Sequence, residues 1–450
     1  MKIRKLKRSN IKKNKGAKPS PRISMLLDKA SSFIEKGRLG QGENICREII
    51  DISPRTSEAY NLLGIIYQGQ GLMDEAIDVL HKSIELDGSN ANAFFNLGTI
   101  WGQLGHYEKA ATLLHKSLSL SPRTPKARNN LGLALVRLGK LDEAIKSIEK
   151  ATELDPHYGE AWFNLGDAYY CGGQLQKAVD AFQRCIRLIP DFVEAHYSLS
   201  IALHDLNLLP EAIETLQRTI ELAPEHMAAH HMLAALSGKT PDSAPHQFIT
   251  NLFDQYSNHF DADLINRLEY TIPKRLRKLL SENTADNTRF PKVIDLGCGT
   301  GLSGQAFHDI ADYLAGIDIS KNMLEKARAK KIYDDLLTGD ICELLPQLPD
   351  FFDLFIAADV MIYIGKLDLL FNAVSNKARP GAYFVFSVES DQENDFILQP
   401  TGRYAHAKDY IARLAATNSF TVMAQEKSGI RKEGDAWIPG EIYILQKNAA

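Results

Sequence analysis

The chain has 450 residues, of which 44% are hydrophobic and 24% charged, and its formal net charge is −4. This length suggests two to three domains with enough apolar side chain to build cores. No run of about 18 apolar residues occurs, which argues against a membrane-spanning helix, and no apolar stretch follows the N-terminal charges, which argues against a secretory signal. The five cysteines are scattered and lack paired metal spacing, so we expect a reducing, cytoplasmic setting and no metal site.

The first 22 residues form a basic segment with ten lysines or arginines and no acid. Residues 1–22 have few large apolar groups to bury, so we expect a disordered tail. A solvated tail is the simplest interpretation. The alternative is a tether to nucleic acid or to an anionic surface.

From Ile23 the sequence repeats every 34 residues. The units start at Ser57, Ala91, Pro125, Gly159 and Val193, with a degenerate copy from Ile23 and a truncated one at Met227. Within the units, the recurring positions are Leu63-Gly64, Leu97-Gly98, Leu131-Gly132 and Leu165-Gly166, then Ala76, Ala110, Ala144, Ala178 and Ala212, and finally Pro122, Pro156, Pro190 and Pro224. This pattern resembles the tetratricopeptide repeat, in which small residues let two helices pack closely and leucines form the stripe between them. The resemblance implies an all-α solenoid of about six units.

Asparagine occupies the same position in three consecutive units, at Asn96, Asn130 and Asn164. A stack of such units curves into a superhelix with an extended concave face, and we expect this position to point into it. Because an amide both donates and accepts hydrogen bonds, these asparagines can hold the main chain of an extended peptide. The ladder therefore predicts that a protein or peptide binds in the groove. A solvated polar face is the alternative.

Turn-forming residues interrupt the pattern between Ser237 and Pro245. We therefore expect the solenoid over residues 23–237, a linker over 238–247 and a second domain over 248–450. In the second domain strands and helices alternate, as a doubly wound, Rossmann-like α/β sheet requires. Residues 421–425 and 442–445 are predicted to be its closing antiparallel strands.

The second domain is organised around a glycine-rich loop, V-I-D-L-G-C-G-T-G-L-S-G, from Val293 to Gly304. Glycines at alternate positions let a ligand approach main-chain N–H groups without meeting a Cβ atom. The same letters contain a dinucleotide fingerprint, which is the rival interpretation. Asp295 stands two residues before the first glycine, where its carboxylate would repel a diphosphate but suit an ammonium or a sulfonium. The charge pattern therefore favours S-adenosylmethionine.

Further acids follow the next strand-like segments, at Asp318, Asp340 and Asp359. Ligands of open α/β sheets bind at the carboxyl ends of the strands, so we expect these acids to converge on one crevice. Asp318 suits the paired hydroxyls of a ribose, and Asp340 can accept a hydrogen bond from an adenine amino group.

Together these segments resemble the class I S-adenosylmethionine-dependent methyltransferases over roughly residues 245–450. The motifs are D-L-G-C-G-T-G (295–301), G-I-D-I-S (316–320), G-D-I (339–341), F-D-L-F-I-A-A-D-V (352–360) and R-P-G-A-Y-F-V-F-S (379–387). With the repeats ahead of it, the chain is similar to bacterial predicted methyltransferases that carry tetratricopeptide repeats. The resemblance implies a cofactor site formed by Asp295, Gly297, Gly299, Gly301, Asp318, Ile319, Asp340, Ile341 and Ala357.

Residues around the expected cofactor site predict its acceptor side. Asp359 and Tyr363 follow the fourth strand, and a loop at 399–406 that follows the fifth carries Arg403 and His406. Arg403 can hold an acidic substrate group. His406 is a candidate general base, because the reference pKa of histidine is about 6.5, or it is only a hydrogen-bonding residue. Catalytic candidates are therefore His406, Tyr363 and Asp359.

Aromatic residues before the glycine loop, Phe253 and Tyr256, resemble the helical lid of many methyltransferases. Such a lid would cover cofactor and substrate and exclude water. A helix that only packs against the sheet is the alternative.

The preferred hypothesis is a methyltransferase whose solenoid binds a protein or peptide partner or acceptor. One alternative is a scaffold with a non-catalytic methyltransferase-like domain. Another is a small-molecule methyltransferase that uses its repeats only for assembly. A dinucleotide-dependent oxidoreductase is the remaining rival.

Overall fold

The structure is a computed structural model that describes residues 20–257, 260–262, 264, 268–391, 393–433 and 436–449, without the side chains of residues 255, 256, 262 and 433. The chain divides into two compact units, Met1–Leu208 and Leu209–Ala450. Residues 1–19 of the predicted basic tail lie outside the described residues. In the described ranges, no helix is both long and apolar enough to cross a membrane.

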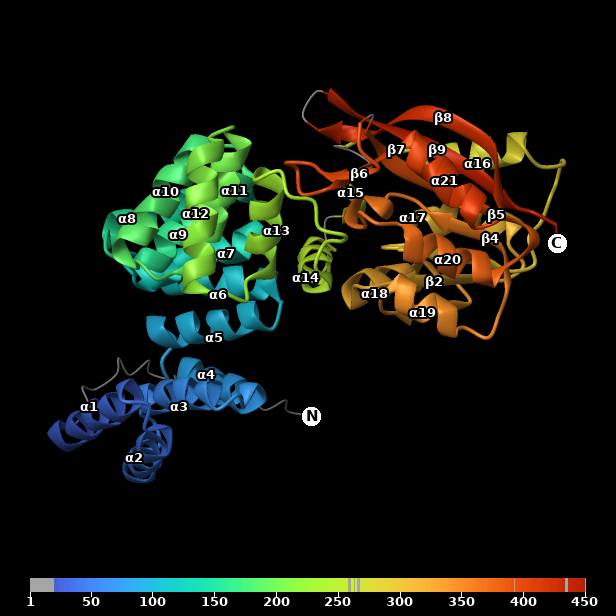
Figure 1. Ribbon diagram of the computed structural model, residues 1–450. Helices are drawn as coiled ribbons and strands as arrows, with labels where there is room; N and C mark the ends of the chain where they lie inside the picture. Colours follow the sequence, from blue (N-terminus) through green and yellow to red (C-terminus); the bar gives the residue numbers. More distant parts are fainter. Residues whose placement is uncertain are drawn as a thin grey trace, which may run out of the picture. The chain divides into compact units, whose positions relative to one another are not determined.

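Helical hairpins build the first unit and the start of the second (Figure 1). The helices of the first unit are α1 (Pro21–Glu35), α2 (Leu39–Ile52), α3 (Ser57–Gly69), α4 (Met73–Leu86), α5 (Ala91–Gln103), α6 (Tyr107–Leu120), α7 (Pro125–Arg137), α8 (Leu141–Leu154), α9 (Gly159–Cys171), α10 (Leu175–Leu188) and α11 (Val193–Asp205). The second unit begins with α12 (Leu209–Leu222) and α13 (Met227–Leu236). The odd-numbered helices from α3 to α13 start at the residues where the 34-residue period places a unit, so this prediction is confirmed.

The repeated glycines of the first unit mark places where two helices touch. A Cβ atom at Gly64 would lie 2.5 Å from Leu80, one at Gly132 would lie 2.2 Å from Ile148, and one at Gly166 would lie 2.5 Å from Phe182. Real Cβ atoms do not approach other atoms so closely, so a larger residue would force the hairpin apart. The Leu-Gly pair of each unit therefore sets the distance between its two helices.

A second recurring contact joins the fourth residue of an odd-numbered helix to the proline six residues before it. Trp162 Nε1 donates to the Pro156 carbonyl at 3.1 Å, and the Tyr60 hydroxyl donates to the Pro54 carbonyl at 3.1 Å. Nε2 of His196 lies 2.9 Å from the Pro190 carbonyl. Three different side chains thus satisfy the same main-chain acceptor between one hairpin and the next.

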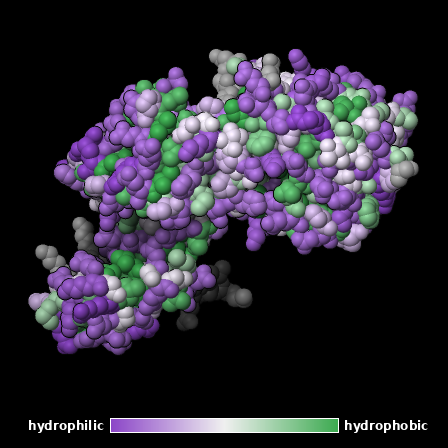
Figure 2. Space-filling view, viewed as in Figure 1, coloured by the Kyte–Doolittle hydropathy of each residue, from purple (hydrophilic) through white to green (hydrophobic). Residues whose placement is uncertain are grey.

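Since the repeats bury their apolar stripes against one another, hydrophilic residues dominate the surface shown in Figure 2, with apolar patches between them. Large exposed hydrophobic side chains are spread along the sequence rather than clustered, for example Met25, Leu72 and Leu369. Scattered exposed side chains of this kind are ordinary on a protein surface.

After α13 the second unit forms a mixed sheet covered by helices (Figure 1). Its strands are β1 (Val293–Leu296), β2 (Leu314–Asp318), β3 (Asp335–Thr338), β4 (Phe352–Ala357), β5 (Ala378–Asp391), β6 (Phe396–Leu398), β7 (Tyr404–Ala407), β8 (Phe420–Glu433) and β9 (Ala436–Lys447). Its α-helices are α14 (His246–Tyr256), α15 (Phe260–Ala262), α16 (Ile272–Glu282), α17 (Leu302–Phe307), α18 (Lys321–Lys330), α19 (Ile341–Leu344), α20 (Asp368–Lys377) and α21 (Lys408–Thr417). Short 3₁₀ turns are η2 (His308–Ile310), η3 (Leu345–Gln347) and η4 (Met361–Tyr363).

The strands are ordered β3-β2-β1-β4-β5-β7-β6, and those from β3 to β5 are parallel. β5 is long enough to pair with two neighbours on its other side, with β9 antiparallel at 383–389 and with β7 parallel at 389–391. β8 pairs with β9. The predicted doubly wound sheet is confirmed, but the closing hairpin is longer than predicted. β7 occupies the end of the predicted loop at 399–406, and β6 directly precedes that loop.

Successive residues of the inner strands face different helix layers. Ile294 and Phe355 pack with α20 and α21, whereas their neighbours Val293 and Leu354 pack with α16 and α17. This alternation follows from the two-residue side-chain period of a strand. Helices therefore cover both faces of the sheet, and the free space for a ligand lies at the strand ends.

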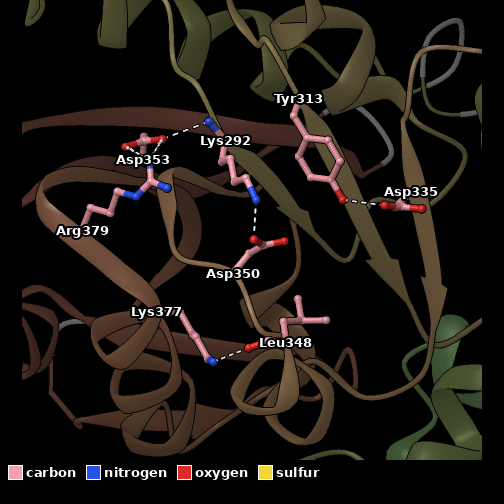
Figure 3. Close-up of polar contacts among 8 residues, drawn as sticks. All are labelled: Lys292, Tyr313, Asp335, Leu348, Asp350, Asp353, Lys377 and Arg379. Atoms are coloured by element: carbon pink, nitrogen blue, oxygen red, sulfur yellow. Dashed lines mark hydrogen bonds and ion pairs between the residues drawn. The ribbon is translucent and has the colours of Figure 1, made fainter.

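Ion pairs hold the opposite, N-terminal ends of the parallel strands (Figure 3). Asp353 Oδ2 accepts from the Lys292 main-chain N–H at 2.9 Å and from Arg379 Nη1 at 3.0 Å. Lys292 also pairs with Asp350, and the Tyr313 hydroxyl donates to Asp335 at 2.6 Å. The Lys292, Asp353 and Arg379 contacts tie β1, β4 and β5 together, and the Tyr313 contact ties β2 to β3, at the end away from the candidate site.

Candidate functional site

A cavity of about 640 Å³ lies at the carboxyl ends of the first four strands. Four residues at or just after the ends of β1, β2, β3 and β4 line it: Gly297, Asp318, Asp340 and Asp359. The predicted convergence of the strand ends on one crevice is therefore present in the structure. Apolar side chains form much of the remaining wall, as is typical of ligand pockets.

The glycine loop between β1 and α17 has a backbone that other residues rarely adopt. Gly297, Gly299 and Gly301 have φ angles of 69°, 53° and 93°. A Cβ atom at Gly297 would also lie 2.5 Å from Cγ2 of Val360, another cavity residue. Glycine is required here by both backbone conformation and space, and the loop leaves its main chain close to the cavity.

Asp318 at the end of β2 is 7% exposed and accepts two main-chain hydrogen bonds. Oδ2 accepts from the Gly299 N–H at 2.7 Å, and Oδ1 accepts from the Ser320 N–H at 2.8 Å. Burial raises the pKa of Asp318 to about 6, although these N–H groups act in the opposite direction. Asp318 thus orders the glycine loop and presents a carboxylate to the cavity.

Asp295 does not face the cavity, so the prediction that its carboxylate meets the ligand is wrong. Its side chain is fully buried, its Oδ2 accepts a 2.6 Å hydrogen bond from the Tyr333 hydroxyl, and it is not among the residues that line the cavity. Burial raises its pKa to about 7. Asp295 therefore supports the loop from beneath and does not face a ligand, so the carboxylates that favour a positively charged ligand are those of Asp318 and Asp340.

Of the other predicted cofactor residues, some line the cavity and one is buried away from it. Ile319, Asp340 and Ile341 line the cavity. Ala357 is fully buried inside the sheet, and its neighbour Ala358 lines the cavity in its place, because successive strand residues point to opposite sides.

Helix α14 and the short helix α15 cover the cofactor half of the cavity. Ser320 Oγ donates to the Asp254 carboxylate, and Nε2 of His246 lies 3.2 Å from Asp340. The Phe253 ring packs edge-on against Tyr363, with ring centroids 5.3 Å apart. Phe253 lines the cavity as predicted, whereas the side chain of Tyr256 lies outside the described residues. This arrangement favours the lid over a helix that only packs against the sheet.

A buried charge cluster forms the other half of the wall. Asp359 has a φ angle of 61°, and its two oxygens accept from Arg431 Nη1 at 2.8 and 2.6 Å. Arg431 Nη2 donates to Glu389 at 2.6 Å, and Arg403 Nε lies 3.4 Å from the same Glu389 oxygen. Although burial alone lowers the pKa of Arg431, the Asp359 and Glu389 carboxylates raise it above its ordinary value. Both oxygens of Asp359 are therefore occupied by Arg431.

Sequence reasoning missed Arg431 and Glu389. Arg431 is 4% exposed and lines the cavity, but it belongs to a part of β8 that lies beyond the predicted end of that strand. Residues 425–433 read Q-E-K-S-G-I-R-K-E and show no apolar alternation, so no local signal marked Arg431 as part of a strand.

His406 does not face the cavity either, so its predicted role as a general base is wrong. It is 1% exposed on β7, its Nε2 lies 2.9 Å from the carbonyl oxygens of both Ile364 and Gly365, and it does not line the cavity. Burial lowers its pKa to about 4. A neutral imidazole between two carbonyls is a structural hydrogen-bond donor, and the geometry offers no route from it to a substrate. Tyr363 does line the cavity, and burial raises its pKa to about 12.

The three asparagines of the ladder in the first unit make hydrogen bonds to the neighbouring repeats. Asn96 Nδ2 donates to Asn61 at 2.8 Å, Asn130 Nδ2 donates to Thr99 at 3.0 Å, and Asn164 Nδ2 donates to Asn129 at 2.9 Å. Each amide group still has a second N–H and further acceptor capacity. Peptide binding by this ladder stays a prediction.

Family models match both parts of the chain. Tetratricopeptide repeat models match residues 57–90, 95–158, 129–191 and 172–236, and a methyltransferase domain model matches residues 294–386. The chain carries tetratricopeptide repeats followed by a methyltransferase domain.

Known proteins resemble this chain only in part. An 18S rRNA (guanine-N(7))-methyltransferase of Bos taurus is 39% identical over 16% of this chain and 26% of its own length. A malonyl-[acyl-carrier protein] O-methyltransferase of Erwinia pyrifoliae is 31% identical over 25% of this chain and 44% of its own length. This chain spans less than half the length of either relative. The crystal structure of YrrB, a TPR protein with an unusual peptide-binding site, matches 41% of this chain and 96% of its own at 24% identity, with a TM-score of 0.37.

The methyltransferase family implies S-adenosylmethionine as the methyl donor, and the residues present fit this group. At Gly299 the main chain is open to the cavity, since a Cβ there would meet only Phe260 at 3.9 Å, and the buried carboxylate of Asp318 reaches the cavity beside it. Ile319 and Ile341 add apolar walls on which an adenine ring can pack.

Proposed function

We propose that the methyltransferase domain transfers a methyl group from S-adenosylmethionine to a nucleophilic acceptor, and that the repeats hold a protein or peptide partner. The main support is the convergence of Gly297, Asp318, Asp340 and Asp359 on one cavity. When bound, the cofactor supplies an activated methyl group on a good leaving group, so catalysis needs mainly positioning and the exclusion of water.

In this proposal the two halves of the cavity have different roles. Asp318 accepts hydrogen bonds from the ribose hydroxyls, and Asp340 with Ile341 frames the adenine. The lid residue Phe253 covers the methyl donor and keeps water out. Tyr363 and the Asp359–Arg431 pair border the acceptor half.

The family match favours this cofactor over a dinucleotide. Asp318 suits the ribose of either cofactor, but a methyltransferase domain model matches residues 294–386. In a melting experiment, S-adenosylhomocysteine should therefore raise the melting temperature of the purified chain and NAD(H) should not. The reverse result would remove the methyltransferase proposal.

Calorimetry on two variants tests the assignment of the site. Asp318→Ala should weaken S-adenosylhomocysteine binding by about tenfold or more, because hydrogen bonds to a charged group are lost. Asp335→Ala, which removes the partner of Tyr313 at the other end of the sheet, should leave the affinity within about twofold. Equal affinities of the two variants would contradict the ribose assignment.

A scaffold role without catalysis is the second candidate. The paired state of Asp359 and the position of His406 outside the cavity wall leave no assigned base, which is compatible with either function. Incubation with methyl-labelled S-adenosylmethionine and an extract of the source cells separates them, since a scaffold would bind the cofactor without transferring label.

A further inference from the structure

Cationic side chains outnumber acidic ones among the residues that line the acceptor half of the cavity. Arg403, Arg431 and Lys432 line it, whereas Asp359 is the only acid of this cluster that does, within the described residues. The acids that pair with these cations, Glu389 and Glu269, are not lining residues: Glu389 bonds Arg431 at 2.6 Å, and Glu269 bonds Lys432 at 2.6 Å.

Asp359 and Arg431 neutralise each other, since both Asp359 oxygens are bound by Arg431. Arg403 and Lys432 also line the cavity, and the acids that pair with them, Glu389 and Glu269, do not. Asp318 and Asp340 line the cofactor half of the cavity, and most of the charged residues that line the acceptor half are cations. A cationic methyl donor suits the acidic half, and an anionic acceptor suits the half with the cations.

Apolar residues line the same cavity as the cations. Leu264, Leu268, Ile362 and Ile364 are among them, and the Leu268 carbonyl accepts from the Lys432 main-chain N–H at 3.0 Å. Such a wall excludes a strongly hydrated acceptor and suits a hydrocarbon or aromatic body.

Among the described residues of the acceptor half, none is suited to remove a proton. Asp359 is held by Arg431, burial raises the pKa of Tyr363 to about 12, and His406 is not a lining residue. An amine or alcohol acceptor would have to lose a proton to such a group, whereas an anionic oxygen is a nucleophile without any base.

Resting on the methyltransferase function proposed above, we propose that the acceptor is a carboxylic acid with an apolar body, that Arg403 and Lys432 with Arg431 hold its carboxylate, and that it is methylated on oxygen. One carboxylate oxygen attacks the methyl carbon, the carbon–sulfur bond breaks, and its electron pair stays on sulfur. The products are a neutral methyl ester and a neutral thioether, and no proton moves. Neutralising two opposite charges inside an apolar, water-excluding cavity favours this reaction.

Alkali distinguishes this acceptor from the others. Full-length protein is incubated with methyl-labelled S-adenosylmethionine and an extract of the source cells, and the product is treated with base. We expect the label to be released as methanol, from the small-molecule fraction if the acid is free and from the protein fraction if a partner carries it. Label that resists alkali would overturn this inference and leave the methyltransferase function standing. No label at all would remove both.

Variants locate the site within the cavity. Arg403→Gln and Lys432→Gln should each slow the formation of alkali-labile label by about tenfold or more, while the melting-temperature shift by S-adenosylhomocysteine stays unchanged. That shift also shows that each variant is folded. Arg379→Gln, which removes an arginine paired with Asp353 at the other end of the sheet, is the control and should keep the parent rate. Parent rates in both cavity variants would overturn the site.

Discussion

His231 on the last repeat helix, α13, is hydrogen-bonded to the loop between β6 and β7 of the methyltransferase domain: its Nε2 lies 2.8 Å from the carbonyl oxygen of Gly402. The imidazole is 2% exposed and packs against Phe248, with ring centroids 4.9 Å apart. Gly402 precedes Arg403, which lines the cavity. The segment after α13 adds to this contact, since Leu398 N–H donates to Thr240 Oγ1 and Ala244 N–H donates to the Tyr363 carbonyl. The last repeat helix is therefore part of the support of the acceptor wall.

Replacing His231 by leucine should destabilise the second unit by about 1–3 kcal/mol, because a buried carbonyl loses its partner. Denaturant unfolding measures this cost. The neighbouring His230 makes a similar 2.8 Å contact to Pro224 but is exposed, so His230→Leu should cost less than about 1 kcal/mol. Equal losses in the two variants would argue against the special role of the buried histidine.

The lid contact predicts an effect on cofactor affinity. Asp254→Ala removes the acceptor of the Ser320 hydroxyl and should weaken S-adenosylhomocysteine binding by about tenfold, because the closed position of α14 loses a charge-assisted hydrogen bond. Titration calorimetry measures the affinity, and a separate thermal melt confirms that the protein is folded. Unchanged affinity would show that α14 does not act as a lid on the cofactor.

Two glycines with left-handed backbone separate the effect of strain from the effect of space. Gly297→Ala meets both, because the new Cβ would lie 2.5 Å from Val360, whereas Gly381→Ala has a φ of 81° and nothing within 4 Å. Both variants should lose about 1 kcal/mol to strain, and Gly297→Ala should lose a further 1–3 kcal/mol, roughly, to overpacking. Chemical unfolding of both proteins provides the comparison. Similar losses would mean that the loop moves to accept a side chain.

Cofactor affinity should depend on pH through Asp318. The pKa of its carboxyl in the free protein is about 6, because burial raises it. The ionised form accepts hydrogen bonds from a ribose, so the affinity for S-adenosylhomocysteine should be constant above pH 7 and should fall roughly tenfold per pH unit below about pH 6. In Asp318→Asn the affinity should be lower and this part of the pH dependence should vanish. The two pH values to compare are pH 8 and pH 5, which lie about two units above and about one unit below the pKa. An affinity of the parent protein that is the same at both would contradict the assignment of Asp318 to the ribose.

The buried His406 makes a separate prediction for stability. Its pKa is lowered to about 4 from an ordinary value of 6.5, so the unfolded chain binds a proton that the folded chain does not between these values. Stability from this residue is therefore fully present above pH 6.5 and is lost as the pH falls toward 4, by on the order of 3 kcal/mol. The unfolding free energy of the parent should fall more steeply than that of His406→Gln as the pH is lowered across this range. Parallel curves of the two proteins would contradict the prediction. Asp295 and Asp318 titrate in the same range with the opposite sign, so the difference between the two proteins is the quantity to compare.

Local patterns predicted the elements of this protein well. The 34-residue period placed helix starts correctly from Ser57 to Met227, because helix packing repeats the same small and large residues at each contact. Alternating glycines predicted the loop after β1. Its positive φ angles are costly for any other residue whatever the tertiary structure around them, so the glycines are a local signal. Acids at strand ends predicted one crevice, because parallel strands bring those ends to the same edge.

Side-chain directions were less predictable. Asp295 and His406 were expected to face a ligand, but Tyr333 binds the first and two carbonyls bind the second. Both partners come from segments about forty residues away in the chain. No local pattern records such pairings.

By itself the sequence determined the two kinds of architecture, the helix limits of the repeats, the glycine loop and the acids that meet at the strand ends. Tertiary structure alone decided which carboxylates reach the cavity, which are buried beneath it, and that Arg431 closes the acceptor wall against Asp359 and Glu389. The physical reason is that backbone periodicity and steric limits act over a few residues, whereas a charge acquires its partner, its burial and its pKa from strands that are far apart in the sequence.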